Sequence, residues 1–222
     1  MSKPNSNPHA VVLTAGGTNA LRLALETLQA GKLVAFPTDT VYGLAALPWD
    51  TEAIARLYKA KQRPAEKPIP LLLSDSEELT RVAALPPQFT SQIKRLISRF
   101  WPGGLTLVLP KAEIVSSAIS PGPTVAVRVP RLPLARELIR DAGGVLAVTS
   151  ANISGQPSPI TAQEVEEQLE GRIAVILDGG PCPGGIPSTL LDCTIWPPTL
   201  LRRGAVSIEK LRAAVGSIGV PE

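Results

Sequence analysis

Basic side chains are concentrated in one short segment of the chain, KAKQRPAEK at residues 59–67. Pro64 and Pro68 stiffen this segment and forbid a helix beyond it. Basic side chains on a rigid segment can form an anion site, in which arginine offers a two-pronged fork to phosphate. A solvated basic loop is the other interpretation. Because the chain has no Walker A sequence, a nucleotide would need a site of this kind. The charged residues of the segment are Lys59, Lys61, Arg63, Glu66 and Lys67.

Three polar clusters each follow an apolar stretch that is typical of a buried strand. They are PTDT at 37–40, TSANISG at 149–155 and DGG at 178–180. Ligands of open α/β sheets gather at the carboxyl ends of strands, so the hydroxyls and amides of these clusters could bind a small polar ligand. Ser, Thr, Asn and Gly are also common in turns, and polar turns remain the alternative interpretation.

A single charged residue, Arg128, interrupts the apolar strand sequence VAVRVP at 125–130. An unpaired charge inside a sheet is costly, so a buried arginine must have an anionic partner. Arg128 is therefore expected either to form a structural ion pair within the protein or to bind the carboxylate of a ligand.

The only histidine is His9, in an N-terminal segment rich in Pro, Asn and Ser. A Ser-His-Asp triad, a Cys-His nucleophile and a histidine-based metal site are therefore not expected. Cys182 and Cys193 lack the spacing of a metal clip, and we expect both to be reduced and structural. We predict no metal site. The remaining Lys, Arg, Ser, Thr, Asn and carboxylate side chains suit anionic substrates.

The composition bounds the class of protein. The 222 residues are 44% hydrophobic and 18% charged, which excludes a disordered chain. No apolar run approaches the roughly 20 residues of a transmembrane helix, and the N-terminus lacks an apolar signal region, so we expect a cytoplasmic protein without a membrane partner. The net charge of +3 is too small to indicate nucleic-acid binding by itself.

Helical and strand patterns alternate along the chain, which predicts an α/β fold: a single domain with a mixed twisted β-sheet flanked by helices. Residues 1–14 are expected to be a flexible N-terminal tail, 15–215 the catalytic domain and 216–222 a C-terminal tail. Helices are predicted over 19–30, 51–61, 76–83, 87–100, 134–142, 161–170 and 207–215. Strands are predicted over 33–36, 69–73, 105–109, 125–129, 145–148, 173–177 and 188–193. The expected helix caps are Thr18 or Asn19, Asp50 or Thr51, Thr161 with Glu164, and Ser207.

Eight motifs occur in a fixed order over about residues 15–210, and their combination resembles the YrdC-like family of threonylcarbamoyl-adenylate synthases. The motifs are FPTDTVYGL, Lys61-x-Arg63-Pro64, KPIPLLL, WPGGLTLVL, TVAVRVP, TSANISGQPSP, GGIPSTLLD and LLRRGAVS. The resemblance implies the YrdC-like fold. It also implies the family's reaction, which joins L-threonine, bicarbonate or CO2 and ATP into L-threonylcarbamoyl-AMP and pyrophosphate. The product is the precursor of N6-threonylcarbamoyladenosine at tRNA position 37.

The resemblance also assigns roles to residues of this sequence. The catalytic signature would be Lys61, Arg63, Ser150 and Asn152. The L-threonine site would be Thr38, Thr40, Arg128 and Ser188. The ATP site would be Lys61, Arg63, Lys67, Thr124, Asn152, Ser158 and Arg202. Relatives commonly have proline where Arg203 stands, which leaves open whether Arg202 or Arg203 faces the nucleotide.

No protein nucleophile is implied, because the substrate amine attacks CO2 or bicarbonate and the resulting carbamate attacks the α-phosphate. Mg²⁺ is expected with ATP, held mainly by phosphates and water, because no dedicated carboxylate cage is visible in the sequence. The implied partners are the substrates and a downstream tRNA threonylcarbamoyl-transfer machinery, with weak RNA binding as a further expectation. The length corresponds to the short form of the family, without the C-terminal domain of longer relatives.

Two other functions compete with this reading. The first is a non-catalytic RNA-binding module of the same fold, which a basic concave surface would suit, although aromatic residues make up only 4% and no stacking motif is present. The second is a carbamoyl-transfer domain like the one in hydrogenase maturation proteins, which normally accompanies zinc-finger cysteines that this sequence lacks.

Overall fold

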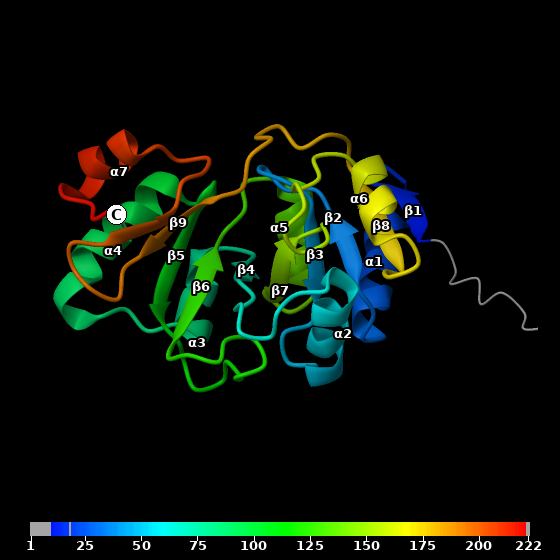
Figure 1. Ribbon diagram of the computed structural model, residues 1–222, viewed down its shortest axis with the longest axis horizontal. Coiled ribbons are helices and arrows are strands. Elements are labelled where there is room, and N and C mark those ends of the chain that lie inside the picture. The colour runs from blue at the N-terminus through cyan, green and yellow to red at the C-terminus, as the bar shows by residue number, and fades with distance from the viewer. Residues whose placement is uncertain (1–9, 18, 221–222) are drawn as a thin grey trace, which may run out of the picture.

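The computed structural model describes residues 10–17 and 19–220, which form one α/β domain around a ten-stranded sheet (Figure 1). The order of the strands is β1-β8-β2-β3-β7-β4-β6-β5-β9-β10. Parallel pairs (such as β4–β6) and antiparallel pairs (such as β3–β7) alternate irregularly, which confirms the predicted mixed sheet. The strands are β1 Val11–Thr14, β2 Val34–Phe36, β3 Gly43–Ala46, β4 Leu71–Leu73, β5 Leu105–Pro110, β6 Thr124–Arg128, β7 Val145–Ser150, β8 Val175–Asp178, β9 Thr189–Asp192 and β10 Thr199–Arg202.

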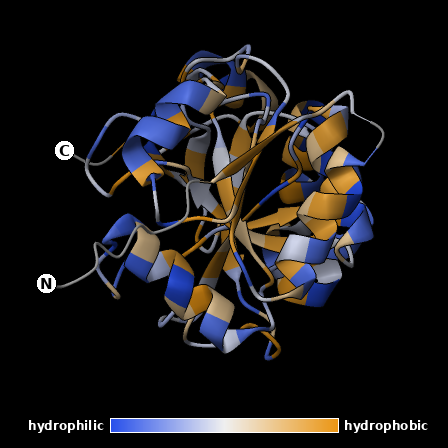
Figure 2. Ribbon diagram, turned by 90° about the vertical axis from the view of Figure 1, so that its right-hand side faces the viewer, coloured by the Kyte–Doolittle hydropathy of each residue, from blue (hydrophilic) through white to orange (hydrophobic). Residues whose placement is uncertain are grey.

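Helices cover both faces of the sheet (Figure 2). Three of the predicted caps are confirmed: Asp50 accepts a hydrogen bond from the Ala53 amide, Thr161 from the Glu164 amide and Ser207 from the Lys210 amide. At the start of α1, the Asn19 side chain makes no capping hydrogen bond, and Thr18 lies outside the described residues. The helices are α1 Ala20–Gln29, α2 Thr51–Lys61, α3 Leu79–Val82, α4 Thr90–Phe100, α5 Pro133–Asp141, α6 Ala162–Leu169 and α7 Ile208–Val215, with 3₁₀ turns at Ser76–Glu78 and Pro87–Phe89.

Two hydrophobic clusters hold the layers together. One joins α1 and α5 to the sheet through residues such as Leu28, Val34 and Leu138. The larger one joins α2, α4, α6 and α7 to the sheet through residues such as Leu57 and Leu96. Burial of fully enclosed aliphatic side chains stabilises the fold by about 1.5–3 kcal/mol each, so these clusters fix the strand ends that carry the polar segments.

The sequence prediction missed three strands. Val11–Thr14 was placed in a flexible tail, yet it forms the edge strand β1, parallel to β8. Its side chains are largely exposed, 56% for Val11, so backbone pairing rather than burial holds it. β3 has the sequence GLAA, whose small residues have low strand propensity. β10 pairs with β9 through an irregular register.

The predicted tails also need correction where the structure describes them. In the C-terminal segment, Ile218 is buried and Gly219 pairs with Thr199, so this part of 216–222 packs on the domain. Residues 1–9 of the predicted N-terminal tail lie outside the described residues. None of the helices formed by residues 10–17 and 19–220 is long and apolar enough to cross a membrane.

The chain approaches itself closely where Gly204, just after β10, lies on the backbone at the start of β9. A Cβ atom at Gly204 would stand 2.3 Å from the Pro187 carbonyl oxygen and 2.5 Å from the Thr189 nitrogen. Because only backbone is in the way, Gly204→Ala is expected to lower the free energy of unfolding by about 1–3 kcal/mol. Gly122→Ala is the matched control, since nothing lies within 4 Å of its Cβ position. Urea denaturation of both variants is the measurement, and equal midpoints would contradict the close approach.

Candidate functional site

A cavity of about 160 Å³ lies where the polar segments after β2 and β7 meet the residues just before β9 and the last residue of β10. We call it the Arg128 pocket. The segments after β2 and β7 lie together because Gly43 pairs with Ser150 and the Ala151 amide donates to the Tyr42 carbonyl over 2.9 Å. Eight of the twelve residues predicted for the site line this pocket: Thr38, Thr40, Arg63, Arg128, Ser150, Ser158, Ser188 and Arg202.

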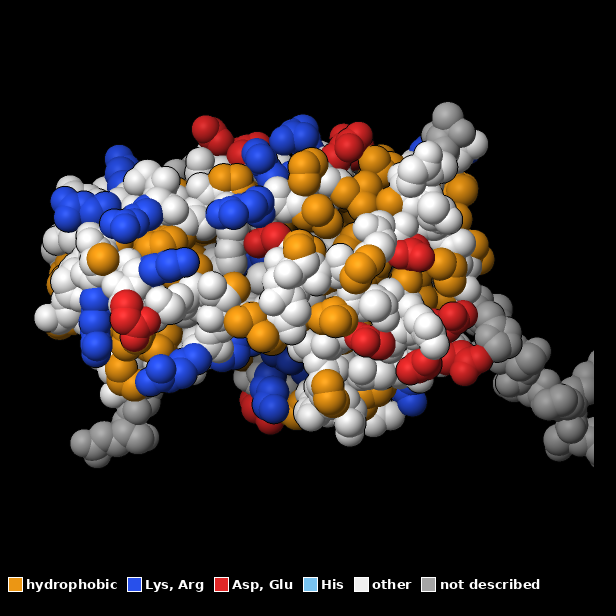
Figure 3. All heavy atoms as spheres, turned by 90° about the horizontal axis from the view of Figure 1, so that it is seen from above, with side chains coloured by type: hydrophobic (Ala, Val, Ile, Leu, Met, Phe, Trp, Pro, Cys, Tyr) orange, Lys and Arg blue, Asp and Glu red, His pale blue; other side chains and the backbone are white. Residues whose placement is uncertain are grey.

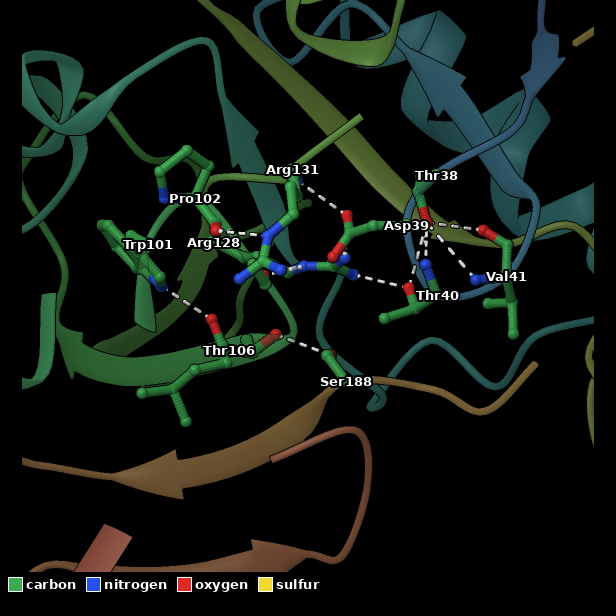
Figure 4. A network of polar contacts seen from close by, with 12 residues as sticks. Thr38, Asp39, Thr40, Val41, Trp101, Pro102, Thr106, Arg128, Arg131 and Ser188 are labelled. Carbon is green, nitrogen blue, oxygen red and sulfur yellow. Dashed lines mark hydrogen bonds and ion pairs between the residues drawn. The ribbon is translucent and has the colours of Figure 1, made fainter. Parts of the chain in front are cut away.

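The guanidinium of Arg128 is 5% exposed and contacts two separate segments (Figure 4). Its Nε donates to the Gly103 carbonyl over 2.8 Å, one terminal nitrogen donates to the Thr40 hydroxyl over 2.8 Å, and the other forms an ion pair with Asp39 at 2.6 Å. Burial lowers the pKa of Arg128, and the Asp39 carboxylate opposes this shift. These contacts use three of the five N–H groups of an arginine.

Both interpretations of Arg128 therefore have a structural basis. The ion pair with Asp39 is present, and the side chain also lines the cavity. Each terminal nitrogen keeps one N–H beyond the contacts above, and a carboxylate in the cavity could accept both.

Thr38 and Thr40 differ in what they can offer a ligand. The Thr38 hydroxyl donates to the Val41 carbonyl over 2.7 Å and accepts from the Thr40 amide over 3.1 Å, so it closes a turn (Figure 4). The Thr40 hydroxyl lies 3.0 Å from that of Thr38 and accepts from Arg128. Thr38 therefore mainly closes the turn, whereas the Thr40 hydroxyl is the one that contacts Arg128.

Arg202, rather than Arg203, faces the pocket. Arg202 donates from Nε and a terminal nitrogen to the Ser188 carbonyl, at 3.1 and 2.9 Å, and reaches the Ser188 hydroxyl at 3.2 Å. Both residues are exposed, but only Arg202 lines the cavity. The pKa of Arg202 is lowered by burial and then by the positive charge of Arg63, so the two cations face a common space.

Lys61 is buried, contrary to the sequence analysis, which placed it in a basic loop. It is 1% exposed, at the last residue of α2, and its ammonium donates to the carbonyls of Ser150 and Asn152. The Asn152 side-chain oxygen lies 3.4 Å away. Lys61 and Asn152 do not line the cavity. Lys61 holds the Ser150 carbonyl, and the Asn152 side chain contacts Lys61 and donates to the carbonyls of Ile153 and Gln156.

Arg63 is fixed by the loop that carries it. Its Nε donates to the Lys67 carbonyl over 3.2 Å and its terminal nitrogen to the Pro68 carbonyl over 2.8 Å. Burial lowers the pKa of Arg63. The segment that carries Pro64 and Pro68 leaves α2 as a loop, as predicted, and its rigidity stays a prediction. The Lys67 side chain is exposed and does not line the pocket. Thr124 does not line it either, since it stands at the opposite end of β6 from Arg128.

Sequence reasoning missed three residues of the site. Asp39 accepts from both Arg128 and the Arg131 amide, at 2.6 and 2.8 Å (Figure 4). The Thr106 hydroxyl lies 2.7 Å from that of Ser188. Tyr42 is fully buried, and its hydroxyl donates to the Gly180 carbonyl over 2.8 Å, which connects the segments after β2 and β8. For Thr106 the sequence contains a signal, because it is a polar residue inside the apolar strand sequence LTLVLP.

The two cysteines are not paired with each other. Cys182 and Cys193 are free and buried, and burial raises the pKa of these thiols to about 11 and about 12. The burial of both thiols fits the structural role predicted for them, and their reduced state stays a prediction. Among the residues that the structure describes, no group of three or more His, Cys, Asp or Glu could hold a metal ion.

The fold and the pocket define a YrdC-like α/β domain, and comparisons with known proteins agree. A family model described as "Telomere recombination" (Sua5_yciO_yrdC) matches residues 26–204. The threonylcarbamoyl-AMP synthase of Pyrococcus abyssi is 44% identical over 201 residues, 90% of this chain and 58% of that protein. The enzyme of the same name from Bacillus subtilis is 44% identical over 199 residues, 89% of this chain and 57% of that protein.

A solved structure gives the same result. P. abyssi Sua5 complexed with L-threonine superposes with a TM-score of 0.90 and 41% identity, covering 96% of this chain and 63% of that one. The chain belongs to the Sua5/YciO/YrdC family, as the ordered motifs predicted. It spans less than two thirds of the length of these relatives.

The buried Lys61 generates a prediction about stability. In Lys61→Met the Ser150 and Asn152 carbonyls lose their donor, which should lower the free energy of unfolding by about 1–3 kcal/mol at neutral pH. Lys59→Met is the matched control, because Lys59 is exposed on the same helical turn. Chemical denaturation measures both variants. A Lys61 variant as stable as the control would show that the ammonium does not hold the 150–152 segment.

The same residue should make stability depend on pH. Burial, and then the charge of Arg63, lower the pKa of Lys61 from 10.5 to about 7. Between these values the unfolded chain binds the proton and the folded chain does not, so stability rises with pH by at most about 1.4 kcal/mol per unit. The free energy of unfolding of wild type, measured relative to Lys61→Met, is therefore expected to increase from pH 7 to pH 10. A flat difference would mean that the carbonyls keep the amine charged.

Proposed function

We propose that this chain forms L-threonylcarbamoyl-AMP and pyrophosphate from L-threonine, bicarbonate or CO2, and ATP, as an ATP-dependent nucleotidyltransferase. The observation that carries the proposal is the buried Arg128, which lines a small polar pocket and keeps two N–H groups for an anion. The family relationship supports it, since the relatives named above are threonylcarbamoyl-AMP synthases and one was solved with L-threonine.

L-Threonine is proposed to bind with its carboxylate on Arg128. The planar fork of an arginine fits a carboxylate in two places, and enclosure strengthens each hydrogen bond. Thr40 and Ser188 line the same cavity with hydroxyls, and Thr38 supports Thr40. These hydroxyls can accept hydrogen bonds from the amino group of the substrate, and they can donate to or accept from its hydroxyl group.

ATP is proposed to lie towards Arg63 and Arg202, with Ser150 and Ser158 nearby in the lining. Two cations that face one space repel each other, and a polyphosphate removes this repulsion. The charge on the departing pyrophosphate would be stabilised by the same side chains. Lys61 acts as a positioning residue for Ser150, and Asn152 contacts Lys61. Lys67 and Thr124 could contact the nucleotide only outside the Arg128 pocket.

Catalysis in this proposal is positioning combined with electrostatic stabilisation. The threonine amine adds to CO2 with loss of a proton, or to bicarbonate with loss of water, and gives a carbamate. A carbamate oxygen then attacks the α-phosphate and displaces pyrophosphate. Alignment of bound reactants can supply several kcal/mol of rate enhancement without a protein nucleophile. The described lining of the pocket includes no carboxylate, so it does not fit a resident metal ion, and Mg²⁺ would enter on the phosphates of ATP.

The product would then pass to a tRNA threonylcarbamoyl-transfer machinery. We therefore propose that the protein acts in the cytoplasm. The competing function is a non-catalytic RNA-binding module. Pyrophosphate release from ATP separates the two: it should require both L-threonine and bicarbonate. Absence of release, together with RNA binding, would establish the competing function.

The two neighbouring arginines provide a matched pair for this assay. Arg202→Ala removes a cation from the Arg128 pocket, so kcat/KM for ATP should fall by about 10- to 150-fold, equivalent to roughly 1.5–3 kcal/mol. Arg203→Ala removes an exposed charge and should stay within about twofold of wild type. Equal losses in both variants would place the nucleotide elsewhere on this surface.

Substitution of Arg128 tests the threonine site. Arg128→Lys keeps the charge but loses the planar fork, so KM for L-threonine should rise at least about tenfold, which corresponds to roughly 1.4 kcal/mol. Because Asp39 and Gly103 also lose a donor, a drop in melting temperature is expected as well. Calorimetry of L-threonine binding at a temperature where both proteins are folded isolates the ligand effect. Equal affinities would assign Arg128 to structure alone.

A further inference from the structure

A second cavity, of about 600 Å³, opens beside the first on the side of α4 and α7. We call it the Lys210 pocket. It shares no lining residue with the Arg128 pocket. The segment PTDT separates the two, with the side chain of Asp39 on this side and those of Thr38 and Thr40 on the other. Gly184 closes the wall, because a Cβ atom there would stand 2.4 Å from the Asp39 carbonyl oxygen.

Three cationic side chains from separate elements line the Lys210 pocket: Arg99 of α4, Arg131 before α5, and Lys210 of α7. In Figure 3, Lys and Arg side chains gather on the part of the upper face formed by α4 and α7, while acidic side chains lie mainly towards the other end. Among the described residues that line it, Asp39 is the only carboxylate, and its ion pair with Arg128 already neutralises it. The pocket is therefore electropositive.

These cations have no acidic partner within the described residues. The ion pairs found there use Glu26, Glu52, Glu78 and Asp39, each with another arginine. Arg99 lies over the Phe100 ring at 5.9 Å, and Arg131 donates from Nε to the Pro102 carbonyl over 3.2 Å. Their terminal guanidinium nitrogens remain available. Like charges that converge on one cavity without a counter-charge favour binding of an anion.

The geometry selects the class of anion. Two guanidinium groups offer planar forks suited to phosphate, and the lysine adds a point charge. The cations come from three elements around a cavity several times larger than the Arg128 pocket, so they can contact more than one phosphate group at once. We propose that the Lys210 pocket is a second anion site, distinct from the Arg128 pocket, which binds an anion carrying two or more phosphate groups.

The test is a calorimetric titration of the full chain with pyrophosphate, in the absence of threonine and ATP. Arg99→Gln/Lys210→Gln removes two cations of the Lys210 pocket. Lys94→Gln/Arg212→Gln is the matched control, because it removes the same charge from exposed positions on the same two helices. We expect the first variant to bind one pyrophosphate fewer than wild type, or to bind it at least tenfold more weakly. The control should bind as wild type does.

Equal stoichiometry and affinity in the two double variants would overturn the proposal. The result does not depend on the proposed enzyme activity: if the Arg128 pocket binds no pyrophosphate, wild type and control show one site and the Arg99/Lys210 variant none. A short single-stranded RNA added in competition distinguishes the source of the phosphates. Displacement of the pyrophosphate that the Lys210 pocket holds would identify a nucleic-acid backbone, and its retention a free polyphosphate anion.

Discussion

The buried guanidinium of Arg128 is the interaction on which the geometry of the site depends. Removing a charge from water costs several kcal/mol unless partners replace the water, and a buried pair is retained only with good geometry. Arg128 meets this requirement by drawing Asp39 and Thr40 from one segment and the Gly103 carbonyl from another onto the end of β6. The charge therefore fixes the loops around it, and a small anion can use the donors that remain.

Lys61 follows the same principle on the opposite side of the pocket. A cation at the C-terminal end of a helix is favoured by the helix dipole, and the ammonium of Lys61 continues from there to the carbonyls of Ser150 and Asn152. The Lys61 carbonyl in turn accepts from the Ser154 amide over 2.8 Å. The polar segment after β7 is thus attached to α2 in both directions. The side chains of this segment can face a ligand because a buried lysine, rather than a ligand, satisfies its backbone carbonyls.

Periodicity and caps predicted most of the fold, because the helices and buried strands carry strong local signals. The caps Asp50, Thr161 and Ser207 are confirmed. β1 and β3 were not predictable from pattern, because one is an exposed edge and the other consists of small residues. The motifs identified eight of the residues that line the Arg128 pocket, but the burial of Lys61 depends on contacts 89 and 91 residues away in the chain. No local pattern contains that information, nor the pairing of Thr106 with Ser188.

The segment PTDT explains how two electropositive cavities can lie back to back. Its one carboxylate, Asp39, accepts from Arg128 on one side and from the Arg131 amide on the other, both through the same oxygen. A negative charge between two groups of cations reduces the repulsion within each of them. A neutral turn of the same shape would close the wall equally well, yet it would leave Arg128 buried without a counter-charge. Asp39 therefore supplies the counter-charge that the buried Arg128 needs, and the turn that Thr38 closes orients its carboxylate.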